Sequence, residues 1–464
     1  MNARRWIFSI LLLLVIAFGS AGVLALVAWQ SLAARPGEWS HRLRVTLVGH
    51  TFEQDASIAV LLRAATHPLA ARIVDGRALT SAQGHWSLRA RPDGALAASC
   101  APCRFALPAL GPRPLEVERA ELVLHSDGAD RYHGTLTLGA QRRITLAGRG
   151  AFKRGGDLAI EARLAPTPLA DVVHVLGTDL PERDVVQVRG TLELVLAAKT
   201  QHGPWRIEPK VEGFEVSGLD TERFADLQRP AACRVDGLAG VPTIDGWLPR
   251  AVIAAEDARF FEHAGYDLKA LADALQRNQR PGATIAGAST LTQQLAKLVA
   301  TGDERSASRK LRELLYAVEM ERTLGKARIL QLYLALAPWG HGVCGAERAV
   351  RLHLGQRDAS AVGPVAAAWL ASLLTAPNAH LKSELAAGEI DHARVARVLD
   401  AMRPMRAERR ERAQLQLLFW SPPALARLRQ AQPPAQPGAE PSMQDVSAAP
   451  TEAASTTLPV APSP

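Results

Sequence analysis

The sequence predicts a multidomain protein: an N-terminal transmembrane helix, a β-rich antiparallel domain and a mainly α-helical domain. Three observations predict this order. An uncharged run from Trp6 to Gln30 is long enough to cross a bilayer. From about Leu43 to Val216, apolar and polar residues alternate as in strands that have one wet face. Beyond Pro249 the apolar spacing becomes helical.

The N-terminal run is preceded by Arg4 and Arg5, so the positive-inside rule places the N-terminus in the cytoplasm. We therefore expect a cytoplasmic stub and membrane anchor over residues 1–35, with the bulk of the chain in the periplasm. A cleaved secretory signal is the alternative, with its cleavage site near Ala33 and Ala34. Signal cores are usually about 7–15 residues long, which favours the uncleaved, single-pass anchor in the inner membrane.

Length and composition set broad limits. A chain of 464 residues is longer than one hydrophobic core usually supports. Its net charge of +8 is compatible with nucleic acid, anionic lipid or a phosphorylated substrate, and does not choose among them. Cys100 and Cys103 form a lone CxxC, without the second pair of a zinc ribbon or the βαβ pattern of a redox site. A disulfide on the export side of the membrane is the favoured reading.

The β-rich domain is expected over residues 36–228, as an antiparallel sheet or sandwich. It contains no cluster of titratable groups that suggests chemistry, so we interpret it as a spacer, a partner-binding module or a lipid-contacting module. Its pattern of alternating strands and glycine turns resembles the repetitive β domains of AsmA-like envelope proteins, although the two share no motif. Prolines and glycines between Gln228 and Pro249 mark its end. A Pro/Ala/Ser-rich tail over residues 429–464 is expected to be disordered.

The first candidate site motif is the stretch AEDARFFEHAG, which contains Glu256, Asp257 and His263. If Val252–Glu262 is helical, Glu256 lies on an apolar stripe. The stripe is made by Val252, Ile253 and Phe260. A carboxylate there loses hydration, which raises its pKa toward the range of a general base. The alternative is a structural carboxylate that caps a helix or pairs with a neighbouring arginine.

The second motif, GASTLTQQLAK, leads from a glycine into an expected helix. Ser289 or Thr290 is the expected N-cap, so free amides face an anion, and Lys297 adds a positive charge. An ordinary capped helix with a polar face is the alternative. The paired Gln293 and Gln294 are unusual for a purely solvated surface.

The third motif, RSASRKLRE, starts at Arg305. We expect a helix whose core stripe is apolar, with Arg309, Glu313 and Tyr316 projecting from the opposite side. The core stripe consists of Leu311, Leu314, Leu315 and Val318. The pattern fits a solvated face with an i,i+4 ion pair. It also fits a pyrophosphate site, where cations screen phosphates and an acid holds a metal or orients a base.

The fourth motif comprises KARILQLYL and WGHGVCGAE, most of which is typical of core packing followed by a glycine-rich turn. Taken in order, the four motifs resemble those of the peptidoglycan glycosyltransferases, the family 51 transglycosylases of penicillin-binding proteins and of monofunctional cell-wall polymerases. The resemblance covers roughly Val241 to Leu381. The WGHGVCGAE stretch is most similar to the monofunctional enzymes.

The resemblance implies a lysozyme-like glycosyltransferase domain, which we place over residues 229–428. It implies polymerisation of lipid II into β-1,4-linked glycan strands with release of undecaprenyl pyrophosphate. Glu256 would be the general base. Glu313 would be the second catalytic carboxylate, on the metal and pyrophosphate side, with Mg²⁺ or Mn²⁺ as the cofactor. Substrate-binding positions of the family fall on Asp257, Ser289, Thr290, Gln293, Gln294, Lys297, Arg305 and Arg309.

The chain departs from the family pattern at Leu298 and Ala335, where asparagine is usual. Neither change removes a carboxylate or a cation, so we expect an active enzyme with altered rate or chain length. No Ser-x-x-Lys motif with its partners follows, so cross-linking is expected from a separate transpeptidase. The expected partners are lipid II, the growing glycan, the membrane and cell-wall proteins, and not nucleic acid.

A second hypothesis is a non-catalytic envelope protein, which keeps the fold to bind lipid-linked saccharide or a cell-wall partner. The presence of Glu256 and Glu313 argues against it, because a binding module has no need of a desolvated base.

Overall fold

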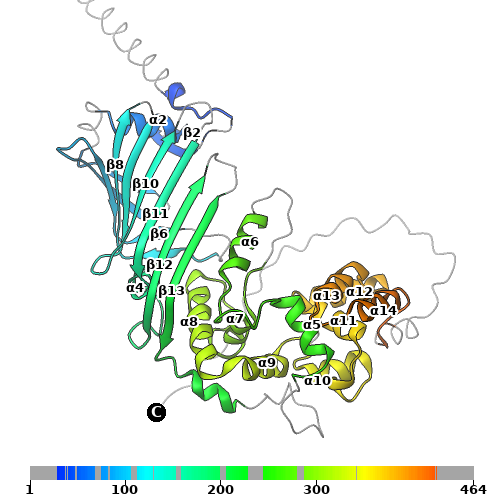
Figure 1. Cartoon of the computed structure of the whole chain (residues 1–464). Helices are drawn as coiled ribbons and strands as arrows, with labels where there is room; N and C mark the ends of the chain where they lie inside the picture. The colour runs from blue at the N-terminus through cyan, green and yellow to red at the C-terminus, as the bar shows by residue number, and fades with distance from the viewer. Residues whose placement is uncertain are drawn as a thin grey trace, which may run out of the picture.

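A computed structural model describes two regions, one of strands and one of helices, and much of the chain between them (Figure 1). The residues it describes are 29–36, 38, 40–47, 50–67, 75–81, 84–105, 112–128, 130–152, 158–198, 205–227, 244–278, 287–340, 342–423 and 425. The expected anchor and the expected tail lie almost wholly outside these ranges. Within these ranges we find no helix whose length and apolar content would suffice to span a bilayer.

The first region is built on one nine-stranded antiparallel sheet, which confirms the antiparallel prediction and is a single sheet rather than a sandwich. Its spatial order is β13-β12-β11-β10-β9-β8-β5-β4-β3, a meander in which most neighbours are joined by short connections. The strands are β3 (Ala78–Ser81), β4 (Gly84–Ala90), β5 (Leu96–Cys100), β8 (Ala120–Gly128), β9 (Arg131–Leu138), β10 (Ile144–Phe152), β11 (Leu158–Pro168), β12 (Gln187–Ala198) and β13 (Arg206–Ser217).

Two short hairpins flank the sheet. One joins β1 (Ser40–Leu47) to β2 (His50–Ser57), and the other joins β6 (Cys103–Phe105) to β7 (Leu115–Val117). Cys100 and Cys103 are bridged between β5 and β6, as the lone CxxC predicted. Cys344 is also in a disulfide, and its partner lies outside the described residues.

Strand register separates an apolar face of the sheet from a polar one. Five leucines are paired in register across neighbouring strands, and they therefore line one face. In order across the sheet they are Leu122, Leu136, Leu146, Leu164 and Leu194. A helix within the region, α4 (Leu169–Leu176), packs on that face and completes a small core. The alternation in the sequence therefore corresponds to a sheet with one apolar face, part of which α4 covers, and one polar face.

Helices α2 (Ile58–Ala65) and α4 were not expected from the sequence, because each is only eight residues long and lies in a stretch that reads as strands.

The second region is helical. Its elements are α5 (Trp247–Glu256), α6 (Leu268–Asn278), α7 (Leu291–Ala296), η3 (Lys297–Thr301), α8 (Ala307–Thr323), α9 (Gly325–Leu336), α10 (Ala346–Ala349), η4 (Val350–Leu354), η5 (Ala359–Ala361), α11 (Pro364–Leu373), α12 (Pro377–Ala387), α13 (His392–Ala401) and α14 (Ala407–Leu417). α11 is buried along its whole length and packs against α5, α13 and α14. Because α11 is buried from Val365 to Leu373, it forms the centre of a group that also contains α5, α12, α13 and α14.

The two regions share one hydrophobic core. Val173, Leu180 and Val216 from the strand region belong to the same buried cluster as the helices, and so do Leu219 and Phe224 of the connecting segment. Figure 1 shows β13 running beside α8, and the two elements are in contact. A short 3-10 helix, η1 (Thr221–Asp226), follows β13 and also contacts α8. The expected domain boundary near residue 228 falls in the undescribed stretch 228–243 and stays a prediction.

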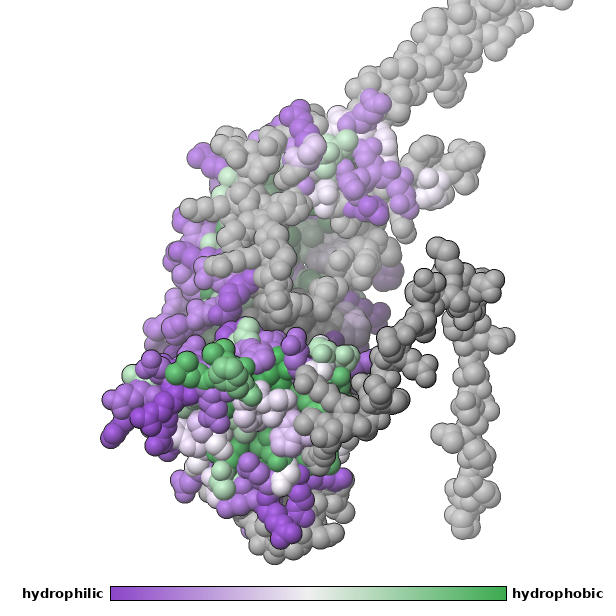
Figure 2. All heavy atoms as spheres, turned by 90° about the vertical axis from the view of Figure 1, so that its right-hand side faces the viewer, coloured by the Kyte–Doolittle hydropathy of each residue, from purple (hydrophilic) through white to green (hydrophobic). Residues whose placement is uncertain are grey.

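Figure 2 looks onto the side of the molecule that carries the C-terminal helices, and hydrophobic side chains gather there among hydrophilic ones. At the end of α14 the exposed apolar side chains are Leu415, Leu418 and Phe419. Such an exposed group is unusual for a helix that otherwise packs its apolar residues inward.

Candidate active site

Glu256 is the last residue of α5, and the residue as a whole is partly buried. Its Oε2 accepts a hydrogen bond of 2.9 Å from Nε2 of Gln294 on α7. Its Oε1 is buried and has no hydrogen-bond partner among the described residues. A buried acceptor without a partner is rare in folded proteins, because leaving it unpaired costs free energy. It marks a place where a substrate group is expected.

Burial raises the pKa of Glu256 above the ordinary glutamate value, and the neighbouring Asp257 raises it further, while the hydrogen bond from Gln294 lowers it. The predicted desolvated carboxylate is thus confirmed. Its alternative, a carboxylate paired with an arginine, is not what the structure has. Arg259 pairs with Asp267 instead, and Arg250 stacks on Trp247.

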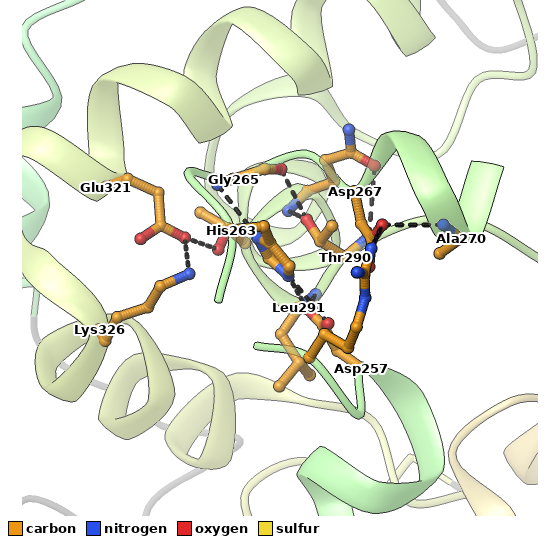
Figure 3. Close-up of polar contacts among 12 residues, drawn as sticks. Asp257, His263, Gly265, Asp267, Ala270, Thr290, Leu291, Glu321 and Lys326 are labelled. Atoms are coloured by element: carbon orange, nitrogen blue, oxygen red, sulfur yellow. Dashed lines mark hydrogen bonds and ion pairs between the residues drawn. The ribbon is translucent and has the colours of Figure 1, made fainter. Parts of the chain in front are cut away.

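The helix expected over Val252–Glu262 is wrong at its C-terminal end, because α5 stops at Glu256. Asp257 leaves the helical conformation and its carbonyl accepts from Phe260 N, which starts a series of turns. The helix ends here because Asp257 makes tertiary contacts. His263 Nε2 lies 2.9 and 3.0 Å from the two carboxylate oxygens of Asp257. One of these oxygens also accepts a 2.9 Å hydrogen bond from the backbone N–H of Leu291. These bonds hold the first motif against the start of α7 (Figure 3).

Gly265 completes this connection. Its φ of +86° lies in the region that favours glycine, and an added Cβ would lie 2.8 Å from the carbonyl oxygen of Ala317 on α8. Its own carbonyl accepts a 2.8 Å hydrogen bond from Oγ1 of Thr290 (Figure 3). The first motif is therefore pinned to both α7 and α8.

Thr290 is the N-cap of α7, one of the two N-cap residues, Ser289 or Thr290, that the sequence predicts. It forms a capping box with Gln293: Oγ1 accepts from Gln293 N, and Thr290 N donates to Gln293 Oε1. Both residues are buried. Three of the residues expected to bind substrate, Asp257, Thr290 and Gln293, thus have polar groups engaged in holding the loop.

Gln294 has a different environment from Gln293. Its Oε1 accepts a 2.8 Å hydrogen bond from the hydroxyl of Tyr333 on α9, while its Nε2 donates to Glu256. Because the tyrosine hydroxyl fixes the amide oxygen, the amide nitrogen is directed at the carboxylate. Burial and the charge of Glu256 raise the pKa of Tyr333 well above its usual value. No role for Tyr333 is predicted from the sequence. The signal that could have found it is a polar hydroxyl in an otherwise apolar, buried motif.

On α8, Glu313 is 2 % exposed and forms ion pairs with Arg309 and Lys310. The Lys310 Nζ lies 2.9 Å from Oε2 of Glu313 and donates a 2.5 Å hydrogen bond to Oγ of Ser289, before α7. Burial lowers the pKa of Lys310 to about 8, and the nearby cations Arg309 and Lys297 act in the same direction. Lys310 was inside the third motif, yet no separate role was predicted for it.

The prediction that Glu313 and Tyr316 project away from the core of α8 is wrong. Glu313, Tyr316 and Glu319 are all buried, as are Leu315 and Val318 of the expected core stripe. The reason is that α8 has neighbours on more than one side. It packs against α7, α9, β13 and η1.

The remaining predicted cations are more exposed. Lys297 begins the π-helical segment η3, and its side chain is 40 % exposed and paired with Asp303 at 2.7 Å. Arg305 is exposed just before α8. Lys297 and Gln294 lie three residues apart, so they are neighbours along α7 and η3. α7 and the residue before its N-cap contact both groups: Gln294 donates to Glu256, and Ser289 accepts a hydrogen bond from Lys310 at the start of α8.

The surroundings of Glu313 do not fit a divalent cation. Mg²⁺ and Mn²⁺ prefer several oxygen ligands, whereas Glu313 faces a guanidinium and an ammonium group. Among the described residues there is no group of three or more metal-ligating side chains. The requirement for a divalent cation stays a prediction, and no step below depends on one.

A carboxylate with one buried, unpaired oxygen, together with a cationic cluster that contacts the same helix, indicates a class: an acid–base enzyme that acts on a substrate with an anionic group. A family model described as "Transglycosylase" matches residues 236–403. The match covers the helical region as far as α13, and leaves out α14 and the nine-stranded sheet.

Proteins named biosynthetic peptidoglycan transglycosylase give the same result. The chain is 40% identical to one from Nitrosomonas eutropha over 174 residues, which is 37% of this chain and 70% of that protein. It is 44% identical to one from Thiobacillus denitrificans over 178 residues, 38% of this chain and 75% of that protein. With one from Alcanivorax borkumensis the identity is 45% over 135 residues, 29% of this chain and 55% of that protein. The chain belongs to the transglycosylase family.

Proposed function

We propose that this chain is a peptidoglycan glycosyltransferase, which polymerises lipid II into β-1,4-linked glycan strands and releases undecaprenyl pyrophosphate. Membership of the transglycosylase family supports the reaction class. The observation that carries the mechanism is Oε1 of Glu256, a buried acceptor without a partner whose carboxyl has a raised pKa.

In this mechanism Glu256 is the general base. Its carboxylate takes the proton of the 4-hydroxyl on the acceptor sugar as that oxygen attacks the anomeric carbon of the donor. The bond from this carbon to the diphosphate oxygen breaks, the electron pair leaves with the diphosphate, and the configuration inverts. A raised pKa suits the task, because a base is most effective when its pKa approaches the working pH. The amide of Gln294 orients the carboxylate through Oε2 and leaves Oε1 for the substrate.

The cationic groups act on the leaving diphosphate. Arg309 and Lys310 start α8, and Lys297 and Arg305 lie on the segment that precedes it. Fixed positive charges in a partly buried site stabilise the charge that develops on the departing oxygen. Glu313 holds the two α8 cations in place through its two ion pairs. Asp257, Thr290 and Gln293 position the loop, and Ser289 positions Lys310.

We also propose the setting in which the enzyme works. The uncharged N-terminal run is a single-pass anchor in the inner membrane, with the N-terminus in the cytoplasm and the rest in the periplasm, where lipid II is presented. Cross-links come from a separate transpeptidase. Ala335 is buried in α9, and Leu298 is 41 % exposed beside Lys297. Neither replaces a carboxylate or a cation, so both fit an active enzyme.

The test is polymerisation of labelled lipid II by the purified full-length protein in detergent. We expect Glu256→Gln to reduce polymer formation by about 10²–10⁴-fold, the usual contribution of a general base. Glu262→Gln is the matched control, because this exposed glutamate lies in the same motif. We expect it to retain activity within about twofold.

The alternative, a non-catalytic protein that binds lipid-linked saccharide, gives a different result in the same assay. Wild-type protein would then bind lipid II and yield no polymer. Polymer formed by Glu256→Gln at the wild-type rate would also remove the proposed mechanism.

A further inference from the structure

The helix that carries the cationic cluster is held by the strand region along most of its length. At its first turn, Oγ of Ser308 donates a 2.5 Å hydrogen bond to Asp179. Near its C-terminal end, Glu319 accepts a 2.9 Å bond from Leu219 N, and Thr323 shares a 2.8 Å hydrogen bond with Thr221. Asp179 belongs to the loop between α4 and β12, whereas the other two partners follow β13.

The strongest of these contacts is in the middle of the helix. Glu182, from the same loop as Asp179, forms a two-pronged ion pair with Arg312, with distances of 2.8 and 2.9 Å from Nε and 2.5 Å from Nη2. The hydroxyl of Tyr316 donates to the same carboxylate at 3.2 Å. Side chains of Glu182 and Arg312 are 12 % and 20 % exposed, so the pair is largely shielded from solvent. A bidentate, shielded pair fixes geometry as well as adding energy.

Arg312 lies between the residues that form the cationic cluster. Lys310 and Glu313 are its near neighbours on α8, and Arg309 is one turn earlier. A helix transmits rotation and translation as a rigid rod over one or two turns, because its backbone hydrogen bonds resist local distortion. A shift of Arg312 therefore also shifts Arg309, Lys310 and Glu313 relative to α7.

We propose that Glu182 is a positioning residue for glycosyl transfer, through which the strand region sets the placement of α8 and its cations relative to Glu256. This inference rests on the proposed function. It gives the sheet a part in the reaction, although the sheet lies outside the residues matched by the transglycosylase family model. In this proposal the strand region holds α8 and its cations in position for the reaction.

The experiment compares the full-length wild type with Glu182→Ala by lipid II polymerisation and by amide hydrogen exchange of residues 307–323. We expect kcat to fall about tenfold or more, because small displacements of reacting groups reduce rates strongly. KM for lipid II is expected to stay within about twofold. Exchange in α8 is expected to become about tenfold faster or more, with α11 unchanged.

Two further variants separate positioning from general destabilisation. In Glu182→Arg with Arg312→Glu, the ion pair is rebuilt with reversed charges, and we expect it to recover most of the kcat lost in Glu182→Ala. Glu116→Ala is the control, since Glu116 pairs with Arg104 on the exposed hairpin at 2.8 Å and both side chains are more than half exposed. It should leave kcat and exchange at wild-type values. If Glu182→Ala does not fold, Glu182→Gln and Ser308→Ala carry the same test.

Unchanged exchange in α8, or faster exchange with an unchanged kcat, would overturn the inference. So would failure of the reversed pair to recover kcat while α8 is protected as in the wild type. A wild-type protein that forms no polymer would instead defeat the proposed function, and the exchange data would still report whether Glu182 holds α8.

Discussion

Each region of this molecule contains a glutamate between two cations, and the two groups differ in almost every physical property. In the sheet, Glu161 pairs with Arg149 at 3.0 Å and Arg163 at 2.6 Å, and the arginine side chains are 75 % and 65 % exposed. In the helical region, Glu313 pairs with Arg309 and Lys310, and its side chain is 3 % exposed.

The difference is one of surroundings. Around Glu161 water and salt screen the charges, so the pairs add little to stability. Around Glu313 the loss of water strengthens each interaction and moves the pKa of Lys310 down to about 8. The comparison teaches that charge pattern alone does not make a site. A glutamate between two cations becomes chemically useful only where burial makes the charges costly to leave unpaired.

The largest expected effect comes from removing one cation of each group. We expect Lys310→Met to lower kcat/KM for lipid II by about 10²–10³-fold, as for the loss of one group that stabilises developing charge. Arg163→Met, on the open face of the sheet, should stay within about twofold. Steady-state polymerisation kinetics measure both. Equal effects of the two substitutions would break the comparison.

A smaller effect is expected on stability when alanine replaces either of two glycines that have similar φ angles. Gly265 has φ +86° and would place a Cβ 2.8 Å from Ala317 O, whereas Gly94 has φ +82° and open space around it. Gly265→Ala should destabilise the protein by about 2–4 kcal/mol, because backbone strain and overpacking add. Gly94→Ala should cost about 1–2 kcal/mol, from backbone strain alone. Urea unfolding gives both values, and a Gly94→Ala that is as destabilising as Gly265→Ala would contradict this account.

Glu256 and Glu161 should change the free energy of unfolding with pH in opposite directions. The folded-state pKa of Glu256 is raised, so the free energy of unfolding falls as pH rises from the ordinary value of 4.5 through the raised pKa. Activity should be lost as pH falls through that same raised pKa, because the base becomes protonated. The hydrogen bonds from Arg149 and Arg163 lower the pKa of Glu161, so its contribution is present above 4.5 and is lost below it.

The measurement for this pair is the free energy of unfolding of the wild type, Glu256→Gln and Glu161→Gln from about pH 3 to about pH 8, which covers the range on both sides of 4.5. Glu256→Gln should gain stability relative to the wild type as pH rises. An acid limb of activity centred at or below 4.5 would show that Glu256 is hydrated and not the base described here.

The smallest effect is expected from an exposed pair of the sheet. Glu121 and Arg91 lie 2.7 Å apart with side chains 37 % and 42 % exposed. Glu121→Gln should change the free energy of unfolding by less than about 0.5 kcal/mol and leave polymerisation unchanged. A loss above about 1 kcal/mol would show that the sheet, too, depends on its charges.

Local sequence pattern was enough to predict the antiparallel sheet, the disulfide of Cys100 with Cys103, a helix N-cap at Ser289 or Thr290 and the desolvation of Glu256. These features follow from spacing over a few residues: alternation in strands, a CxxC, a hydroxyl before a helix, and an acid among apolar side chains. Each was recognisable because the deciding interactions are made by residues close in sequence.

Tertiary structure alone decided the rest. α5 stops at Glu256 because Asp257 binds Leu291, 34 residues away. Glu256 takes its orientation from Gln294, and Gln294 takes its own from Tyr333, 39 residues further on. Both sides of α8 are buried because the loop with Glu182, 130 residues before Arg312, packs on it. The sequence alone identifies which residues can do chemistry, whereas burial and long-range hydrogen bonds, which no local pattern encodes, decide how those residues are placed.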